Sequence, residues 1–312
     1  MCPPLLVANI ERKLVRVNFE FGALRWNCAE RKERMSLKGV AKETLHILKE
    51  GKYITDSGNN VEFLSEQRNA VIGTKLYKPE QGYELLAQES TNKTERPLVI
   101  EVTDKTTQVA AKRLVQTEGC DDVVLLNYAS ARNAGGGFTN GAKAQEEDLC
   151  RCSGLYPCLL TQPLYYQVNR NQDSLFYTDH VIYSPKVPWF RSQNRDLLDR
   201  VFLASVITAP APNAGEVINH NEGGWTEIEK VLKRRAGIIL AIARQRQHRT
   251  LLLGAWGCGV FRNRPSMVAS AFGSWFEDAK FSGCFERVVF AIYDGSQEKH
   301  TLHAFQTQFH SN

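Results

Sequence analysis

The chain has 312 residues, of which 43% are hydrophobic and 23% charged, and its formal net charge is +5. This length is enough for one large or two small domains with a buried core, and the composition is that of an ordinary soluble globular protein. No apolar run reaches the roughly 18 residues that suggest a membrane span, so no membrane partner is expected.

The N-terminus lacks the basic leader that precedes the apolar stretch of a secretory signal. Without an export signal, the eight cysteines are expected to be thiols in a reducing compartment, cytoplasmic, nuclear or both. Residues 1–35 show no clear period and are interpreted as an extension or an accessory strand pair, for example over residues 13–19.

Apolar residues from Leu37 to Leu48 recur at helical spacing, which predicts a helix that Gly51 ends. Residues 56–59 are typical of a turn between short β-like runs. We expect residues 1–96 to form an N-terminal helical and β extension that packs on a catalytic domain of residues 97–312, as one compact unit from about residue 35.

From residue 97 onward, apolar runs alternate with helical patterns. Strands are predicted over residues 98–103, 122–127, 180–183, 202–207, 250–254 and 287–293, and helices over residues 106–117, 225–246, 265–280 and 297–309. This alternation predicts an α/β fold in which helices cover both faces of a mixed, mostly parallel sheet. Ligands of such sheets bind at the carboxyl ends of the strands, where two glycine-rich segments of this chain are expected.

The first glycine-rich segment follows the predicted strand 122–127. Gly135, Gly136 and Gly137 tolerate positive φ and can present successive N–H groups to an anion, although a triplet alone also fits a flexible surface loop. After a spacer, Glu146 and Glu147 stand at the start of a predicted helix, where the helix dipole favours acidic residues. Adjacent helical residues point about 100° apart, so one carboxyl can face a reacting bond while the other holds the substrate.

The second glycine-rich segment, residues 254–263, follows a predicted strand and precedes a helix that Pro265 can open. A strand, a glycine loop and a helix N-terminus together suit a diphosphate. A dinucleotide-binding loop of the Rossmann type fits poorly, because a third glycine and a later acidic partner are missing. Cys258 is interpreted as a small buried filler rather than a nucleophile, since no histidine stands near it in the sequence.

Cys150, Cys152 and Cys158 form the one local cysteine cluster of the sequence. Their spacing does not match the paired two-residue gaps of structural zinc sites, and no histidine stands nearby to complete a site. We therefore expect neither a metal nor a cofactor.

The glycine triplet, the spacer 138–144 and the following Gln-Glu-Glu together resemble the motif of the compact, microbial-type poly(ADP-ribose) glycohydrolases, in the macrodomain superfamily. The resemblance extends from about Met35 to the C-terminus and implies a macrodomain-like three-layer α/β/α fold. It implies that Glu147 is the catalytic acid, that Glu146 binds ribose hydroxyls and that Gln145 supports the loop. Asn133 resembles the macrodomain asparagine that contacts the distal ribose.

The second segment resembles the macrodomain loop that wraps the diphosphate of ADP-ribose. The residues implied to contact phosphates and ribose are Gly257, Gly259, Val260 and Phe261. For Phe261 a place in the core is an equal alternative. Asn263 and Arg262 stand where they can approach a phosphate, but family members often carry a smaller residue in place of Arg262, which leaves its role open.

Asp104 has two readings. It either caps the helix that begins near Thr106, which we favour, or reads the adenine amino group as an Asp does in related macrodomains.

The resemblance implies hydrolysis of ribose–ribose O-glycosidic bonds in poly(ADP-ribose), releasing ADP-ribose. The reaction passes through an oxocarbenium-like state, for which Glu147 would protonate the leaving oxygen and then activate water. We expect a monomer that acts on the polymer or on an ADP-ribosylated macromolecule, in reversal of ADP-ribosylation and the DNA damage response, without sequence-specific nucleic-acid binding.

Three alternatives remain open. A non-catalytic ADP-ribose reader is disfavoured by the presence of both Glu146 and Glu147. A hydrolase of mono-ADP-ribose on protein or a nucleobase has the same pocket and is not separable by sequence. A nicotinamide-dependent oxidoreductase is the weakest, because no site for a hydride acceptor is found.

Overall fold

The computed structural model describes residues 36–90, 93–221 and 223–309, and the strand pair expected near residues 13–19 lies outside them. Contacts within the chain divide it after Ser36, and the helices and strands of the described residues belong to the unit Leu37–Asn312. The domain boundary expected near residue 97 stays a prediction. Among the described residues, none of the helices combines the length and apolarity needed to cross a bilayer.

The first part of this unit contains a small strand pair, helices and one edge strand of the central sheet. They are α3 (Leu37–Glu50), β1 (Lys52–Ile54), β2 (Asn60–Glu62), α4 (Leu64–Gly73), β3 (Lys75–Tyr77) and α5 (Pro79–Ala87). The predicted helix and the turn between two strands are confirmed, with Gly51 in the left-handed region at φ +67°. The helices and the strand between residues 64 and 87 were not predicted.

The second part contains most of the central sheet and its covering helices. Its elements are β4 (Val99–Thr103), α6 (Thr107–Lys112), the π-helical η1 (Arg113–Thr117), β5 (Val124–Tyr128), the 3-10 turn η2 (Phe138–Asn140), α7 (Gln145–Cys152), α8 (Leu155–Leu160), α9 (Pro163–Arg170), β6 (Val181–Arg191), β7 (Leu197–Ala209), α10 (Ala214–Asn219), α11 (Trp225–Gln245), β8 (Thr250–Gly254), α12 (Pro265–Phe276), β9 (Arg287–Ala291) and α13 (His300–Phe309).

Within the described residues, seven strands form one sheet in the order β3-β6-β7-β5-β8-β9-β4. Strands β7, β5, β8, β9 and β4 run parallel, and β3 and β6 extend the sheet in antiparallel fashion. The predicted mixed, mostly parallel sheet is confirmed. The carboxyl ends of the parallel strands therefore meet at one edge of the sheet.

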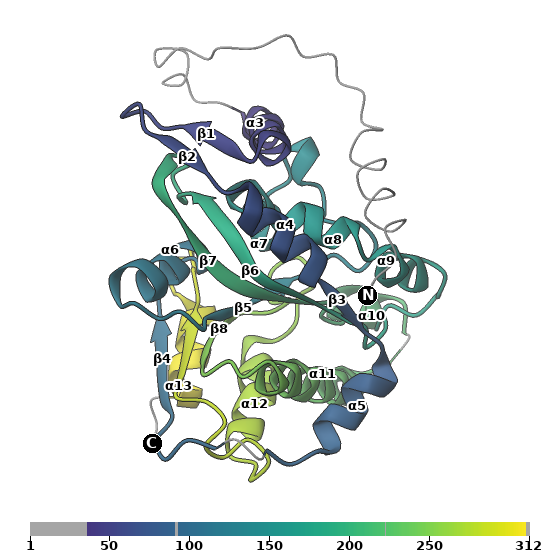
Figure 1. Cartoon of the computed structure of the whole chain (residues 1–312). Coiled ribbons are helices and arrows are strands. Elements are labelled where there is room, and N and C mark those ends of the chain that lie inside the picture. Colours follow the sequence, from purple (N-terminus) through teal and green to yellow (C-terminus); the bar gives the residue numbers. More distant parts are fainter. Residues whose placement is uncertain (1–35, 91–92, 222, 310–312) are drawn as a thin grey trace, which may run out of the picture. The chain divides into compact units, whose positions relative to one another are not determined.

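Helices cover both faces of this sheet, as Figure 1 shows. Alternate residues of β5 serve the two layers: Val124 and Leu126 pack with α11 and α12, and Leu125 packs with α7 and α8. This alternation follows from the two-residue period of a strand, and the near-zero exposure of both sets explains the continuous apolar run in the sequence. The three-layer α/β/α architecture is thus confirmed.

Strands β6 and β7 are much longer than the predicted strands 180–183 and 202–207, and they form an antiparallel hairpin. The pairing register shifts between Ser184 and Val187, where Lys186 takes a positive φ of +44°. A bulge of this kind bends a strand without ending it. Pro185 and Lys186 interrupt the apolar pattern there, so the sequence indicated an end where the strand only bends.

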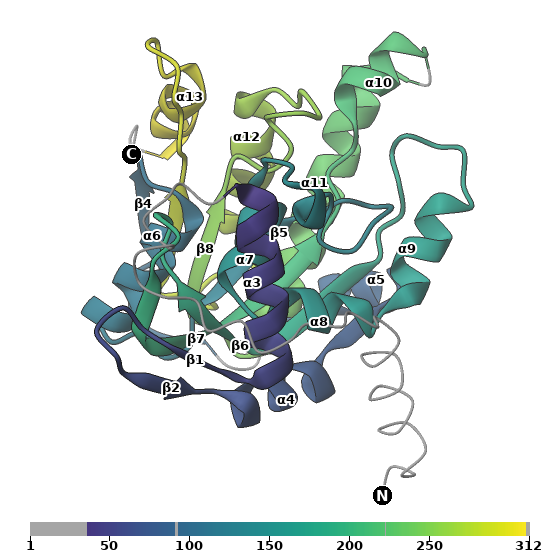
Figure 2. The same cartoon turned by 90° about the horizontal axis from the view of Figure 1, so that it is seen from above.

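Helix α3 packs on the helix that carries the two adjacent glutamates. Figure 2 shows α3 lying across α7, and the hydroxyl of Thr44 donates a hydrogen bond of 2.8 Å to the carbonyl of Arg151. An added Cβ on Gly141 would lie 3.2 Å from the side chain of Lys38. The start of α3 therefore also packs against the segment between the glycine triplet and α7.

Candidate active site

The two glycine-rich segments leave the sheet from neighbouring parallel strands. Val124 of β5 pairs with Leu251 of β8, so the loops that follow Tyr128 and Gly254 begin side by side at the carboxyl edge. The Tyr128 hydroxyl lies where a Cβ on Gly254 would stand, and burial raises the pKa of this tyrosine far above its usual range. A glycine at the end of β8 is therefore required for the strands to approach here.

The glycine triplet is folded tightly around the carboxyl of Glu147. Gly135 and Gly136 take φ values of +68° and +56°, which side chains rarely adopt. The N–H of Gly137 donates a hydrogen bond of 3.0 Å to Oε1 of Glu147. A Cβ on Gly136 would overlap the same oxygen. The triplet is thus a bare backbone surface that holds one carboxyl in place.

Glu146 is buried more deeply than Glu147, although the carboxyls of both lie near Gly136. It is 2% exposed, and its carboxyl accepts hydrogen bonds from the Ser130 N–H at 2.7 Å and from the Asn127 side chain at 3.2 Å. Burial raises the pKa of Glu146 to about 8, although both of these hydrogen bonds oppose the shift. This carboxyl is therefore mostly neutral near pH 7. In its neutral form it carries an O–H group that can donate a hydrogen bond.

The side chain of Gln145 forms hydrogen bonds within the protein. Its Oε1 accepts a hydrogen bond of 2.8 Å from the Tyr128 N–H, and its Nε2 donates to the Leu126 carbonyl at 2.8 Å and to the Thr107 hydroxyl at 3.3 Å. These bonds join the first residue of α7 to the end of β5. The geometry favours the expected support of the loop over direct contact with a ligand.

Asn133 lies in the first loop with its backbone fixed and its side chain exposed. Its N–H donates to the Ser130 hydroxyl at 3.1 Å, and its carbonyl accepts from the Gly136 N–H at 3.0 Å. Among the described residues its side-chain amide has no hydrogen-bond partner. The amide is therefore available to a ligand beside the triplet.

The second loop has an exposed tip and a buried base. Gly257 takes a φ of +71° with its α-carbon against Ala211, whereas Gly259 has open space around it. Val260 is 81% exposed, although it is apolar. Phe261 packs partly on the core, and its ring centroid lies 6.0 Å from that of Tyr177. The two roles expected for Phe261 are thus compatible, since the residue is only partly buried.

Asn263 does not point into the exposed part of the loop. It is 2% exposed, and its Nδ2 donates to the carbonyls of Pro212 at 2.9 Å and Gly257 at 3.1 Å. We infer that it shapes the loop rather than approaches a phosphate. Its neighbour Arg262 is exposed and takes a left-handed φ of +55°.

The favoured reading of Asp104 as a helix cap is wrong. The N-cap of α6 is Thr106, whose hydroxyl accepts a hydrogen bond from the Val109 N–H at 3.5 Å. Asp104 instead forms an ion pair with Lys299, which lowers the pKa of its carboxyl. This pairing could not be predicted, because Lys299 is 195 positions from Asp104 in the chain.

The cysteines of the described residues are buried or half-buried thiols. Burial raises the pKa of Cys152, Cys158 and Cys258 to about 12, so these side chains are protonated and weakly nucleophilic near pH 7. Within the described part of the chain, no group of three or more His, Cys, Asp or Glu side chains is placed to hold a metal.

Several site residues carried no signal in the sequence. Asn127 and Ser130 hold Glu146, yet one ends an apolar run and the other lies in an unremarkable loop. The loop of residues 171–180, which includes Tyr177, was assigned no role. The strand order places this loop at the carboxyl edge of the sheet, because β6 begins at the edge where β7 ends.

The comparisons with known proteins point to one family. The family model described as "Microbial-type PARG, catalytic domain" matches residues 41–192. The structure is similar to that of poly(ADP-ribose) glycohydrolase from Thermomonospora curvata, with a TM-score of 0.83 and 41% identity over 88% of this chain and 99% of that one.

Two further structures contain ligands. The Thermomonospora curvata enzyme bound to the inhibitor ADP-HPD has a TM-score of 0.81 and 42% identity, over 88% of this chain and 99% of that one. Poly(ADP-ribose) glycohydrolase from Deinococcus radiodurans in complex with ADP-ribose has a TM-score of 0.73 and 44% identity, over 78% of this chain and 97% of that one. No curated protein matches the chain.

Proposed function

This chain belongs to the microbial-type poly(ADP-ribose) glycohydrolases, and we propose that it cleaves the polymer with Glu147 as general acid and base. The reaction is hydrolysis of a ribose–ribose O-glycosidic bond, with ADP-ribose as the product. The family assignment supports this reaction over ADP-ribose binding without turnover, as in a reader module, and over the reaction of a nicotinamide-dependent oxidoreductase.

The position of the Glu147 carboxyl is the observation that carries the proposal. Glu147 is 9% exposed and lies in the first turn of α7 at the carboxyl edge of the sheet, and its carboxyl accepts a hydrogen bond of 3.0 Å from the Gly137 N–H. A single N–H bond leaves its second oxygen, Oε2, available to a substrate. A carboxyl fixed in this way can protonate the leaving oxygen and then accept a proton from the attacking water.

The two glutamates have different tasks because their surroundings differ. Glu146 is held by Asn127 and Ser130 and is mostly neutral near pH 7, so its O–H can donate to a ribose hydroxyl. Glu147 lies against the glycine triplet, where the reacting bond can reach it. One carboxyl thus binds the sugar and the other transfers the proton.

The remaining contacts are assigned by position. We propose that Asn133 binds the distal ribose and that Gly135, Gly136 and Gly137 bring bare backbone against it. The second loop binds the diphosphate and the adjoining ribose through Gly257, Gly259, Val260 and Phe261, with Asn263 fixing its base.

The setting of the reaction is also a proposal. We infer a monomer that acts in a reducing compartment, cytoplasmic or nuclear, to reverse ADP-ribosylation in the DNA damage response. The six cysteines of the described residues are free thiols, which supports such a compartment.

A product analysis tests the function. The protein is incubated separately with labelled poly(ADP-ribose), mono-ADP-ribosylated protein and mono-ADP-ribosylated DNA, and the products are separated by chromatography. Free ADP-ribose from the polymer is expected. Binding without release would support a reader instead, and release only from the mono-modified substrates would support the mono-ADP-ribosyl hydrolase.

Glu147→Gln tests the assigned residue. The amide cannot supply or accept the proton, so the rate is expected to fall by about 10²- to 10⁴-fold or more, whereas calorimetry should show nearly unchanged ADP-ribose binding. Asp148→Asn is the matched control, because Asp148 is the next acid of α7 and pairs with Arg151 at 2.5 Å. Full activity of Glu147→Gln would remove Glu147 from the mechanism.

A further inference from the structure

The loop between α9 and β6, residues 171–180, lies at the same sheet edge as the two glycine-rich loops. Strand β6 runs antiparallel to β7, and Ile182 near its start pairs with Thr208 near the end of β7. The Asn213 N–H donates a hydrogen bond of 3.1 Å to the Leu175 carbonyl. The segment after β7 therefore lies between this loop and the second glycine-rich loop, whose Asn263 is bonded to Pro212.

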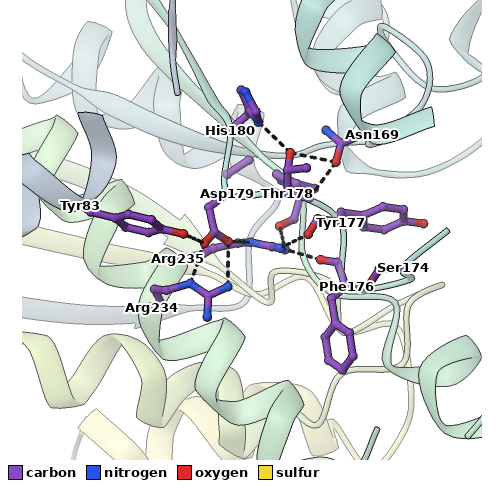
Figure 3. A network of polar contacts seen from close by, with 12 residues as sticks. Tyr83, Asn169, Ser174, Phe176, Tyr177, Thr178, Asp179, His180, Arg234 and Arg235 are labelled. Atoms are coloured by element: carbon purple, nitrogen blue, oxygen red, sulfur yellow. Dashed lines mark hydrogen bonds and ion pairs between the residues drawn. The ribbon is translucent and has the colours of Figure 1, made fainter. Parts of the chain in front are cut away.

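One buried side chain holds these segments together, as Figure 3 shows for Arg235 of α11. Its guanidinium is fully buried and donates to the carbonyls of Phe176 at 2.5 Å, Tyr177 at 2.9 Å and Pro210 at 2.9 Å. Its Nε donates to Asp179 at 2.6 Å. A planar fork with five N–H groups can serve four acceptors at once, which a lysine cannot do.

The charge of Arg235 is balanced inside the protein. Asp179 is 5% exposed and also accepts hydrogen bonds from Arg234 at 2.6 Å and from the Tyr83 hydroxyl at 2.6 Å. Burial opposes ionisation of this carboxyl, but the hydrogen bond from Arg234 and the charge of Arg235 lower its pKa to about 2. The network therefore stays ionised throughout the range in which the protein works.

The network fixes a strained residue at the edge of the site. Tyr177 takes a φ of +59°, a backbone conformation that costs a bulky residue free energy and persists only when its surroundings enforce it. Arg235 holds its carbonyl, and Asn169 accepts from both the N–H and the hydroxyl of the next residue, Thr178, at 2.8 and 3.0 Å. The Tyr177 ring faces Phe261 of the second loop.

We propose that Arg235 is a positioning residue, which holds Tyr177 in its left-handed conformation so that the tyrosine ring supports Phe261 and keeps the second loop in the shape that binds ADP-ribose. The inference rests on the proposed function through Phe261. Arg235 itself lies behind the site and contacts no substrate. Its loss leaves the Glu147 carboxyl untouched, so binding weakens while the chemical step is preserved.

The test measures binding, turnover and stability in the full chain. Tyr177→Gly removes the ring and relieves the left-handed strain, so the melting temperature is expected to stay constant or rise. The Kd for ADP-ribose and the KM for polymer are expected to rise about tenfold, which is the effect of ordering one or two side chains on binding. The value of kcat is expected to change less than about threefold.

Arg235→Lys is expected to give the same rise in Kd and KM with a lower melting temperature. Arg191→Lys is its matched control, because Arg191 is equally buried and pairs with Glu43 at 2.9 Å, at the far end of β6 from Tyr177. The control should lower the melting temperature as well but leave Kd and KM unchanged. Tyr177→Phe keeps the ring and the held backbone and should behave as the wild type.

The outcomes separate this inference from the proposed function. A wild-type Kd in Tyr177→Gly overturns the inference, whether or not Arg235→Lys folds. So does a Kd that rises in Arg191→Lys as much as in Arg235→Lys, because the effect would then follow stability alone. A wild-type protein that binds ADP-ribose but releases none from the polymer contradicts the proposed function and leaves the binding test valid.

Discussion

The carboxyl of Glu147 lies directly against the α-carbon of Gly136, eleven positions earlier in the chain. The oxygen that accepts the Gly137 N–H occupies the place where a side chain on Gly136 would stand. The glycine and the acid of the motif are therefore one unit, because the acid needs the space that the missing side chain leaves.

Gly136→Ala is expected to lower kcat by about 100-fold. The added methyl overlaps Oε1 of Glu147, so the carboxyl must move, and a displacement of about 1 Å can reduce the rate by about 100-fold. Gly119→Ala is the control: Gly119 also has a positive φ, +75°, but nothing within 4 Å of an added Cβ. Measured kcat values should fall only for Gly136→Ala, and equal losses would mean that general destabilisation is responsible.

Glu146 is expected to make stability depend on pH. Its pKa is about 8 in the folded protein and 4.5 in the unfolded chain, so between these values the folded state holds a proton that the unfolded state has lost. The associated stability is fully present below pH 4.5 and is lost as the pH rises through about 8, at about 1.4 kcal/mol per pH unit.

Glu146→Gln isolates this effect, because glutamine does not titrate. The difference in free energy of unfolding between wild type and variant, measured in urea at several pH values, should fall steadily across this window. Parallel profiles of the two proteins would show that Glu146 does not bind its proton as tightly as burial predicts.

Gln145→Ala is expected to lower both stability and turnover. It leaves the N–H of Tyr128 and the carbonyl of Leu126 without a partner, which costs about 1–3 kcal/mol for each buried group. The end of β5 and the start of α7 then separate, which displaces Glu147. Gln116→Ala removes an exposed bond to the Arg200 carbonyl and should leave the melting temperature and kcat nearly unchanged. Wild-type kcat in Gln145→Ala would exclude the supporting role.

Val260→Ala is expected to weaken ADP-ribose binding without changing stability. The valine is 81% exposed, so truncation removes almost no packing within the protein. If ADP-ribose covers it, two methyl groups lose their burial and Kd rises by up to about tenfold. Ile72→Ala on α4, where the isoleucine is 71% exposed, is the control and should change neither quantity. An unchanged Kd in Val260→Ala would remove this residue from the site.

Much of the fold was predictable because its signals are local. Strands β5 and β8 are buried on both faces and so appear as continuous apolar runs, and glycines follow both at the sheet edge. The hairpin β6–β7 was underestimated because a bulge at Lys186 interrupts its pattern. Asp104 was misassigned because its partner, Lys299, is distant in the sequence.

The sequence alone determined which residues make up the first loop, since three glycines and two adjacent acids define it by residue type and spacing. It also determined that the two acids differ, because neighbours on a helix point in different directions. It did not determine which one is the more deeply buried. That depends on Asn127 and Ser130, which meet Glu146 only after α7 packs on the sheet.

The tertiary structure alone decided how the loop of residues 171–180 is held at the edge of the site. Arg235, Asp179 and Tyr177 come from a helix and a loop that meet because β6 runs antiparallel to β7. A charge, a carboxylate and a tyrosine spread over residues 177–235 form no pattern in the sequence. Folding buries these residues together. A buried charge without a partner would cost free energy, so Arg235 and Asp179 must pair, and this pairing fixes their geometry.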